Sequence, residues 1–214
     1  MVADAASSMT HLLDVGTGGG EVFADLAALA GVAVAIDHQP KMVHAARQRL
    51  PPQVWVVAGD GFGPPFAAAS FDLVTNRHAQ VDLHECARVL KPAGKVVIQQ
   101  VGGRNMQSVF DAFSWGSNAQ QWQMADRPPP RIGTLAATAE RVGLTVEVAD
   151  EYEVGYALGD LDSLVFILKA IPFPEPFDPV RHEPGVNRLI REYRSARGIE
   201  TTEHREHLGA RKSS

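Results

Sequence analysis

Three aspartates follow three successive apolar runs in the first sixty residues, and carboxylates at such positions could bind the hydroxyls and amines of a nucleoside. Asp14 closes the first run, Asp37 closes the second, and Asp60 follows the third after Gly59. Asp37 lies 21 positions after Gly16, which matches the roughly 20-residue spacing at which an acidic residue reaches a ribose hydroxyl pair. A carboxylate suits this task because it can accept hydrogen bonds from both hydroxyls.

A glycine-rich turn, GTGGG over 16–20, separates the first apolar run from a helical pattern over 21–30. A strand, a turn and a helix N-terminus in this order leave backbone N–H groups unpaired beside a ligand. The dinucleotide fingerprint G-x-G-x-x-G requires glycine or alanine where this chain has Glu21. Asp14 and Glu21 flank the turn and would repel a pyrophosphate. These charges favour a cationic ligand such as S-adenosylmethionine over NAD.

Strands and helices are expected to alternate along the chain, which predicts an α/β fold with a doubly wound, mostly parallel sheet and right-handed crossovers. The predicted strands are 12–15, 32–36, 53–58, 71–75, 95–101 and 144–152, and the predicted helices are 21–30, 41–50, 81–90, 132–142, 160–170 and one around 186–193. The polar tail over 202–212 could add a last antiparallel edge strand after the C-terminal helix.

One domain over 10–214 is expected, after a flexible N-terminus over 1–9. An aromatic, proline-rich insertion over 102–131 and a second segment over 155–200 are expected to form a lid over the site. The formal charge of −5 gives no general attraction to nucleic acid or to an anionic membrane. A lone cysteine, Cys86, and the lack of a signal-like or membrane-spanning pattern favour a cytoplasmic protein.

Four stretches together resemble the motifs of the class I (Rossmann-like) S-adenosylmethionine-dependent methyltransferases, of the small bacterial type: LLDVGTGGGEVFADLA, VAIDHQPKMVHAARQRL, VVAGDGFGPPFAAASFDLV and ARVLKPAGKVVI. The resemblance is strong over 10–101 and weak beyond. It implies a methyltransferase enzyme that uses S-adenosyl-L-methionine and releases S-adenosyl-L-homocysteine.

The resemblance also implies roles for single residues. Asp14, Gly16 and Gly18 would hold the methionine end of the cofactor. Asp37 would take the ribose hydroxyls, with His38 stacking near the adenine. Asp60 would accept from the adenine amino group, with the backbone N–H of Gly61 beside it, and Asn76 would border the transferred methyl group. The cofactor-binding set is completed by Thr17, Met42 and Phe62.

The methyl acceptor is expected to meet residues after the fourth and fifth strands and in the insertion. His78 has the pKa range of a general base, although it could instead cap the next helix or line the pocket. The pattern Asp/Asn-Pro-Pro-aromatic of enzymes that methylate base amines is absent at 75–78. Further candidates for contact with the acceptor are Gln100, Trp115, Trp122 and His204; the tryptophans could equally be core, and His204 could lie on a solvated edge.

The predicted function is methyl transfer to an oxygen or nitrogen of a small molecule, such as a specialised metabolite, without a metal and by a monomer or homodimer. Two alternatives stay open. One is an RNA methyltransferase, because eight Lys and Arg face only five acids from Arg181 onward. Interleaving with glutamates makes a solvated helix face the simpler explanation of these arginines, which argues against nucleic acid. The other alternative is a protein that binds the cofactor without methyl transfer.

Overall fold

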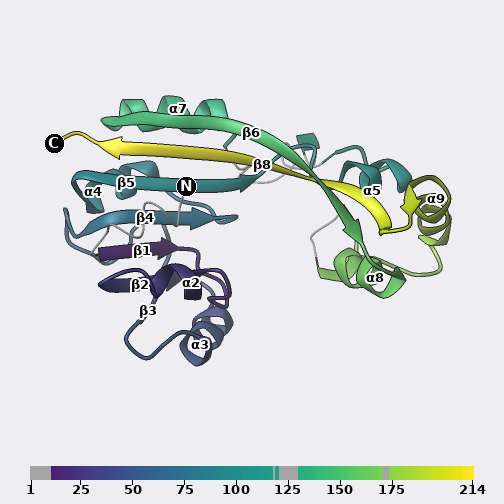
Figure 1. The fold of residues 1–214 in the computed structure, drawn as a ribbon, viewed down its shortest axis with the longest axis horizontal. Coiled ribbons are helices and arrows are strands. Elements are labelled where there is room, and N and C mark those ends of the chain that lie inside the picture. The colour runs from purple at the N-terminus through teal and green to yellow at the C-terminus, as the bar shows by residue number, and fades with distance from the viewer. Residues whose placement is uncertain (1–10, 118, 121–129, 171–173) are drawn as a thin grey trace. The chain divides into compact units, whose positions relative to one another are not determined.

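The computed structural model describes residues 11–117, 119–120, 130–170 and 174–214; the predicted flexible N-terminus lies outside them. The strands (Figure 1) are β1 (His11–Val15), β2 (Val32–Asp37), β3 (Trp55–Ala58), β4 (Phe71–Arg77), β5 (Leu90–Val101), β6 (Leu144–Leu158), β7 (Arg194–Ser195) and β8 (Gly198–Lys212). The helices are α2 (Phe23–Ala27), α3 (Pro40–Arg49), α4 (Leu83–Val89), α5 (Gln107–Ala112), α7 (Ile132–Arg141), α8 (Leu161–Ala170) and α9 (Glu183–Tyr193).

The chain folds into two compact units. The first unit consists of Met1–Gln100, Pro130–Asp150 and Glu206–Ser214, and the second consists of Val101–Pro129 and Glu151–Arg205. The two segments predicted as insertion and cap, 102–131 and 155–200, fall almost entirely in the second unit. No helix among the described residues has the length and apolar content needed to cross a membrane.

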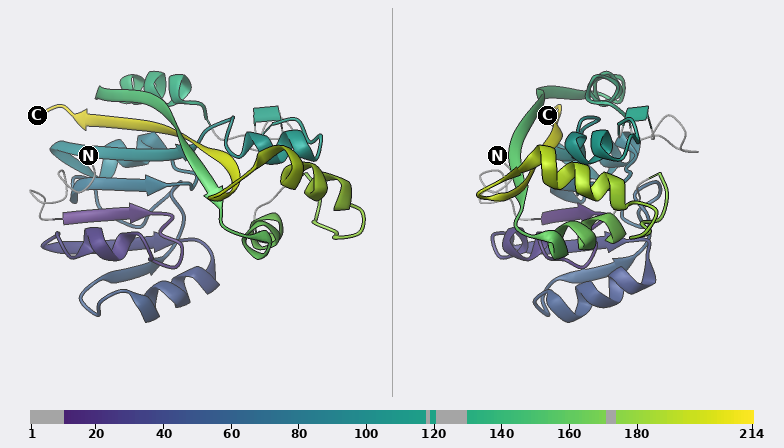
Figure 2. Two further views of the ribbon diagram at one scale, coloured as in Figure 1. Left: turned by 45° about the vertical axis from the view of Figure 1, so that its right-hand side comes forward. Right: turned by 90° about the vertical axis from the view of Figure 1, so that its right-hand side faces the viewer.

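The sheet has the strand order β3-β2-β1-β4-β5-β8-β6, and β7 pairs with β8. Figures 1 and 2 show the strands of the first unit stacked in this order. The strands β1 to β5 pair in parallel, which confirms the predicted α/β fold with a mostly parallel sheet. Their apolar runs suit parallel strands that are covered on both faces.

The C-terminal strand forms as predicted, and its arrow runs opposite to that of β5 (Figure 1). Its expected place at the edge of the sheet was wrong, because β8 lies between β5 and β6 and leaves β6 at the edge. Leu208 and Ala210 of β8 are buried in the core of the first unit. The polar sequence of this strand suggested an edge, yet several of its side chains, those of His204, Glu206 and Lys212, bond to partners that lie far away in the sequence.

Two of these polar side chains cap helices. A carboxylate oxygen of Glu206 accepts a hydrogen bond from the backbone N–H of Ile132 at 2.9 Å, at the start of α7, and Glu206 also pairs with Arg131. The amino group of Lys212 donates to the carbonyl oxygens of Ala87 (2.6 Å) and Leu90 (2.8 Å) at the end of α4. An acid at a helix N-terminus and a base at a C-terminus both oppose the helix dipole, so β8 stabilises α4 and α7.

The core of the first unit lies on both faces of its sheet. Successive side chains of a strand point to opposite faces, and the adjacent Leu12 and Leu13 accordingly belong to different clusters. Leu12 packs with Phe23 of α2 and with the residues that close α3, whereas Leu13 packs with α4 and α7. Helices therefore cover both faces, as the alternating pattern predicted.

The second unit has a core of its own, formed by α5, α8 and α9, which Figure 2 shows beside the ends of β6 and β8. Phe110 of α5, Leu164 of α8 and Leu189 of α9 are buried there almost completely. Each helix has the apolar spacing of a face that packs on its neighbours.

Candidate functional site

The predicted cofactor residues gather at the carboxyl ends of β1, β2 and β4, where doubly wound sheets bind their ligands. The parallel register places Asp14 beside Thr75 and Val15 beside Asn76. Asp37 closes β2, which pairs with the other side of β1. The strand order thus brings together in the first unit the acids that lie 23 residues apart in the sequence.

Asp14 is buried, and the Thr75 hydroxyl donates to its Oδ1 at 2.6 Å. Burial raises the pKa of Asp14 from its ordinary value of 3.8 to about 6, although the hydroxyls of Thr75 and Thr17 and the charge of Arg77 oppose this rise. The Thr17 hydroxyl oxygen is itself buried and has no partner with hydrogen-bond geometry among the described residues. A desolvated carboxyl group beside a buried hydroxyl that lacks a well-aligned partner suits a ligand that carries an ammonium group.

The glycine turn adopts backbone conformations that favour glycine. Gly16 has a φ of 74° and Gly18 a φ of 60°, in the left-handed region that other residues enter with strain. The N–H of Gly16 donates to the carbonyl oxygen of Ile36 at 2.8 Å. A Cβ at Gly16 would overlap that of Ala79, whereas a Cβ at Gly18 would have nothing within 4 Å. The turn is therefore tightly packed at Gly16 and open at Gly18.

Asp37 holds this turn in place. Its Oδ2 accepts from the N–H of Gly18 at 2.9 Å and its Oδ1 from the N–H of Gln39 at 2.8 Å. A carboxylate has about four lone-pair sites, so these two bonds leave capacity for the ribose hydroxyls that the sequence assigned to it. The sequence analysis missed Gln39, although an aspartate three residues before Pro40 is a typical signal for such a turn.

The charge of Glu21 does not act on the ligand in the way that the sequence suggested. Arg49, the last residue of α3, pairs with Glu21 and also donates to the carbonyl oxygen of Gly19 at 3.3 Å. The two charges largely compensate each other. The preference for a cationic ligand therefore depends on Asp14.

The remaining predicted cofactor residues differ in exposure. Asp60 is exposed, and its Oδ1 accepts from the N–H of Phe62 at 2.9 Å. The Phe62 ring is exposed as well. A Cβ at Gly61 would lie 2.7 Å from Cγ1 of Val15, so Gly61 packs closely on the end of β1.

Two predicted residues follow β2. The His38 ring is largely exposed, with its Nδ1 at 3.9 Å from Oδ1 of Asp37. Met42 is half-buried on α3. Both lie on the segment that Asp37 anchors.

Asn76 and Gln100 form an amide relay whose orientation is fixed by its two ends. Nδ2 of Asn76 donates to the carbonyl oxygen of Val15 at 2.9 Å, which can only accept. Nε2 of Gln100 donates to Oδ1 of Asn76 and to the carbonyl oxygen of Ala79, each at 2.9 Å. Both N–H groups of Gln100 are used, so the atom that it can offer to a ligand is Oε1, which is a hydrogen-bond acceptor.

His78 directly follows β4 in a left-handed conformation, with a φ of 56°. Its backbone N–H donates to the carbonyl oxygen of Gln99 at 2.9 Å. Its side chain is exposed. The bond to Gln99 fixes the backbone of His78 at the carboxyl end of β4.

Trp115 belongs to the second unit and is part of its core. Its ring stacks on Phe113 at a centroid distance of 4.4 Å and meets the ring of His182 edge-on at 5.5 Å. The Trp115 N–H donates to Glu175 at 3.3 Å. This position corresponds to the alternative that the sequence left open, a core residue beneath a long segment. Trp122 lies outside the described residues.

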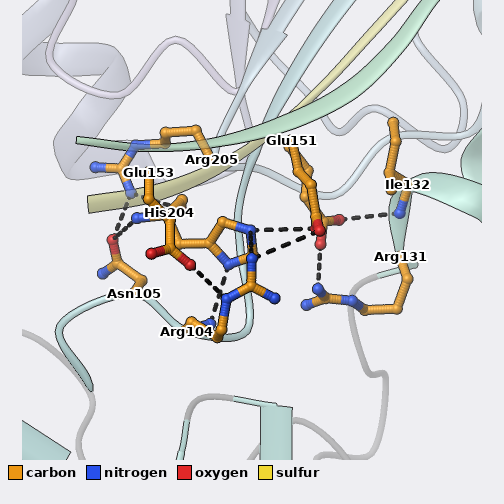
Figure 3. A network of polar contacts seen from close by, with 9 residues as sticks. Arg104, Asn105, Arg131, Ile132, Glu151, Glu153, His204 and Arg205 are labelled. Carbon is orange, nitrogen blue, oxygen red and sulfur yellow. Dashed lines mark hydrogen bonds and ion pairs between the residues drawn. The ribbon is translucent and has the colours of Figure 1, made fainter. Parts of the chain in front are cut away.

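His204 is fully buried in the second unit (Figure 3). Its Nδ1 accepts from the backbone N–H of Arg104 at 3.0 Å, and its Nε2 lies 3.2 Å from a carboxylate oxygen of Glu151 and 3.3 Å from the guanidinium of Arg104. Arg104 pairs in turn with Glu153, and Asn105 accepts from the N–H of His204 at 3.2 Å. Both ring nitrogens of His204 thus have partners inside this unit.

Thr75 is a site residue that the sequence analysis missed. Its contact with Asp14 depends on the register of β1 against β4, and a sequence pattern does not reveal strand register. A hydroxyl-bearing residue among the apolar residues of β4 was the available signal.

Comparison with known proteins finds a family model that matches this part of the chain. Residues 13–98, which include every residue named above from Asp14 to Asn76, match the family model described as "Methyltransferase domain". The biotin biosynthesis bifunctional protein BioHC of Cellvibrio japonicus is 39% identical over 100 residues, which cover 44% of this chain and 20% of that protein. The demethylmenaquinone methyltransferase of Mycobacterium sp. (strain KMS) is 39% identical over 95 residues, covering 41% of this chain and 40% of that protein.

The match therefore spans only a fifth and two fifths of the length of these two curated relatives. Among solved structures, a Bacillus halodurans protein provisionally described as a methyltransferase has a TM-score of 0.64 at 19% identity. The match covers 100% of this chain and 96% of that one. This likeness extends the shared fold over the whole chain.

Proposed function

We propose that this chain, whose residues 13–98 match the family model of a methyltransferase domain, transfers a methyl group from S-adenosylmethionine to an oxygen or nitrogen of a small molecule. The observation that carries the proposal is the environment of Asp14. Its carboxyl group is buried and has a raised pKa, it lies near the buried hydroxyl of Thr17, and it is the next-to-last residue of the strand that leads into the glycine turn.

These groups fit the proposed cofactor. Asp14 and Thr17 would hold its α-ammonium group. Burial deprives the Asp14 carboxylate of solvation by water, and a cation beside it would stabilise the negative charge instead. Asp37 would accept from the ribose hydroxyls while keeping Gly18 in place, and Asp60 would accept from the adenine amino group. The sulfonium of this cofactor supplies a methyl group on a good leaving group, so positioning the acceptor is the main task left to the protein.

Two observations support a small acceptor rather than nucleic acid. The chain has a net charge of −5, which opposes binding to a polyanion. One relative is named as a demethylmenaquinone methyltransferase, and that name denotes a small-molecule substrate.

Gln100 and His78 are the residues proposed to meet the acceptor. Oε1 of Gln100 would accept a hydrogen bond from an O–H or N–H of the acceptor, because the relay with Asn76 prevents the amide from turning its N–H groups outward. His78 would take up the proton that the acceptor loses. Both roles favour an acceptor that carries a proton on the atom to be methylated.

The test begins with titration calorimetry of S-adenosylhomocysteine. We expect saturable binding by the wild type, and Asp37→Ala should weaken it by about 1.5–3 kcal/mol, the range for hydrogen bonds to a charged group. Asp72→Ala is the matched control, because Asp72 also accepts a backbone N–H, from His11 at 2.9 Å, but does so at the opposite end of the sheet. The control should keep the wild-type affinity.

Absence of binding by the wild type would reject the proposed cofactor. Transfer of labelled methyl groups from S-adenosylmethionine is then followed in the small-molecule and RNA fractions of a cell extract. Label in RNA alone would contradict the small acceptor, and binding without any transfer would reject the enzymatic part of the proposal.

Replacing His78 with asparagine is expected to lower the rate of label transfer by about 10²–10⁴-fold, the usual contribution of a general base. Asparagine tolerates the left-handed backbone of this position, so the fold and the affinity for S-adenosylhomocysteine should not change. An unchanged rate and pH profile would show that transfer needs no base at His78.

A further inference from the structure

The glycine turn of the first unit has few backbone donors left for an anionic group of a ligand. The N–H groups of Gly16 and Thr17 donate to the same carbonyl oxygen of β2, at 2.8 and 3.1 Å. The N–H of Gly20 donates inside the turn, to the carbonyl oxygen of Thr17 at 3.2 Å, and that of Gly18 donates to Asp37. The fold itself thus uses four of the five N–H groups of the turn. A carboxylate, which accepts several hydrogen bonds, needs donors from elsewhere.

The proposed cofactor carries such a carboxylate at its methionine end. The α-ammonium and α-carboxylate groups sit on the same carbon atom, so the residues that hold the one must lie close to those that hold the other. Asp14 is proposed to hold the ammonium group, and its negative charge repels a carboxylate nearby. A cation close to Asp14 would remove this conflict.

Arg77, the last residue of β4, is such a cation. It is still in register with β5, opposite Gln99. Alternate residues of a strand share one face of the sheet, so Arg77 lies on the same face as Thr75, whose hydroxyl donates to Asp14 at 2.6 Å. The charge of Arg77 accordingly opposes the rise in the pKa of Asp14 that burial causes. Arg77 therefore lies one step beyond Asp14 and Thr75, at the carboxyl edge of the sheet.

The guanidinium of Arg77 is available to a ligand. The residue is exposed, and within the described ranges its guanidinium forms neither an ion pair nor a hydrogen bond. A guanidinium can give a carboxylate two parallel hydrogen bonds. The other arginines of the first unit all bond to a protein group: Arg47, Arg49, Arg88, Arg131, Arg141 and Arg211.

We propose that Arg77 binds the α-carboxylate of the cofactor and thereby makes the site selective for S-adenosyl ligands that keep this group. Asp14 and Arg77 then form a pair of opposite charges that matches the zwitterionic amino-acid end of the ligand. This inference rests on the proposed function, because it takes the same cofactor and the same role of Asp14.

The test is titration calorimetry with two ligands, S-adenosylhomocysteine and decarboxylated S-adenosylhomocysteine. The wild type is expected to bind the decarboxylated ligand about 10–100-fold more weakly, the range for hydrogen bonds between charged groups. Arg77→Ala should lose a similar factor for S-adenosylhomocysteine, yet bind the decarboxylated ligand as the wild type does. Arg77→Lys should recover part of the loss, because lysine keeps the charge but not the planar fork.

Arg141→Ala is the matched control. Arg141 is an exposed arginine of the first unit that bonds within its own helix, to Thr138 at 2.8 Å, so its removal should leave both affinities unchanged. Equal affinity of the wild type for the two ligands, or an equal loss or no loss for both in Arg77→Ala, would overturn this inference and leave the cofactor standing. Absence of binding of either ligand by the wild type would instead reject the cofactor, and this inference with it.

Discussion

Replacing Asp14 with asparagine is expected to stabilise the ligand-free protein near neutral pH and, at the same time, to weaken its binding of S-adenosylhomocysteine. The folded protein holds the pKa of this carboxyl group at about 6 instead of 3.8. Below pH 3.8 the group is protonated in both states and its burial is not penalised. As the pH rises through this window the unfolded state ionises first, so stability falls, and above pH 6 the full penalty is present.

The size of this effect follows from the shift. A difference of roughly two pKa units corresponds to about 3 kcal/mol, which is the upper limit for the gain of Asp14→Asn at about pH 7.5. The Thr75 hydroxyl can still donate to the amide oxygen. Affinity for the ligand should fall by about 1.5–3 kcal/mol, because the charged partner of the ammonium group is lost.

Urea denaturation over the range from about pH 4 to 8 checks the prediction. The advantage of Asp14→Asn should vanish at the acid end, where the wild-type carboxyl is neutral too. Asp25→Asn, on the exposed surface of α2, is the matched control for the loss of a carboxylate and should leave the free energy of unfolding close to that of the wild type. A variant that is equally destabilised at both ends of the range would show that Asp14 is fully compensated in the fold.

Replacing Gly16 with alanine is expected to destabilise the protein by more than about 3 kcal/mol, whereas Gly18→Ala should cost only about 1 kcal/mol. Both glycines have positive φ angles, so both alanines suffer backbone strain. The two positions differ in the room that is available for the added Cβ. The new Cβ at Gly16 would overlap Ala79, and the new Cβ at Gly18 would stand in the open.

Denaturation of the two variants side by side separates strain from overlap. Ala79→Gly combined with Gly16→Ala should recover most of the lost stability, because it removes the overlapping carbon. Gly18→Ala should fold yet bind S-adenosylhomocysteine at least about tenfold more weakly, since the open space at Gly18 is where the proposed cofactor approaches the turn. Equal stability of Gly16→Ala and Gly18→Ala would contradict the packing described for the turn.

The sequence predicted the first half of the fold well, because its signals are local. Buried parallel strands appear as continuous apolar runs, and Pro40 and the Pro51-Pro52 pair mark the ends of α3. The predicted helix over 21–30 shortened to Phe23–Ala27, which is the kind of error expected at helix ends. Asp14, Asp37 and Asp60 could be identified from the sequence because each lies at or just after the end of an apolar run, which is also a local signal.

Contacts between distant residues could not be predicted. Arg49 lies 28 residues from Glu21, and no local pattern shows that it removes the charge on which part of the cofactor argument depended. The polar residues of β8 suggested an exposed edge because their partners, such as Ile132 for Glu206, lie 74 residues away. Register and long-range pairing decide these contacts, and neither leaves a periodic signal.

The position of β8 inside the sheet has a consequence for the order of synthesis. The first unit is made from three separate stretches of chain, and its last stretch, Glu206–Ser214, leaves the ribosome after the whole second unit. Until then β5 and β6 cannot take their places on either side of β8, and α4 and α7 lack Lys212 and Glu206. Until β8 is synthesised, the edge of β5 in the nascent first unit therefore has no partner strand. In such a state chaperone binding and aggregation compete with folding. Both segments of the second unit precede Glu206 in the sequence, so the second unit can fold before the first unit is complete.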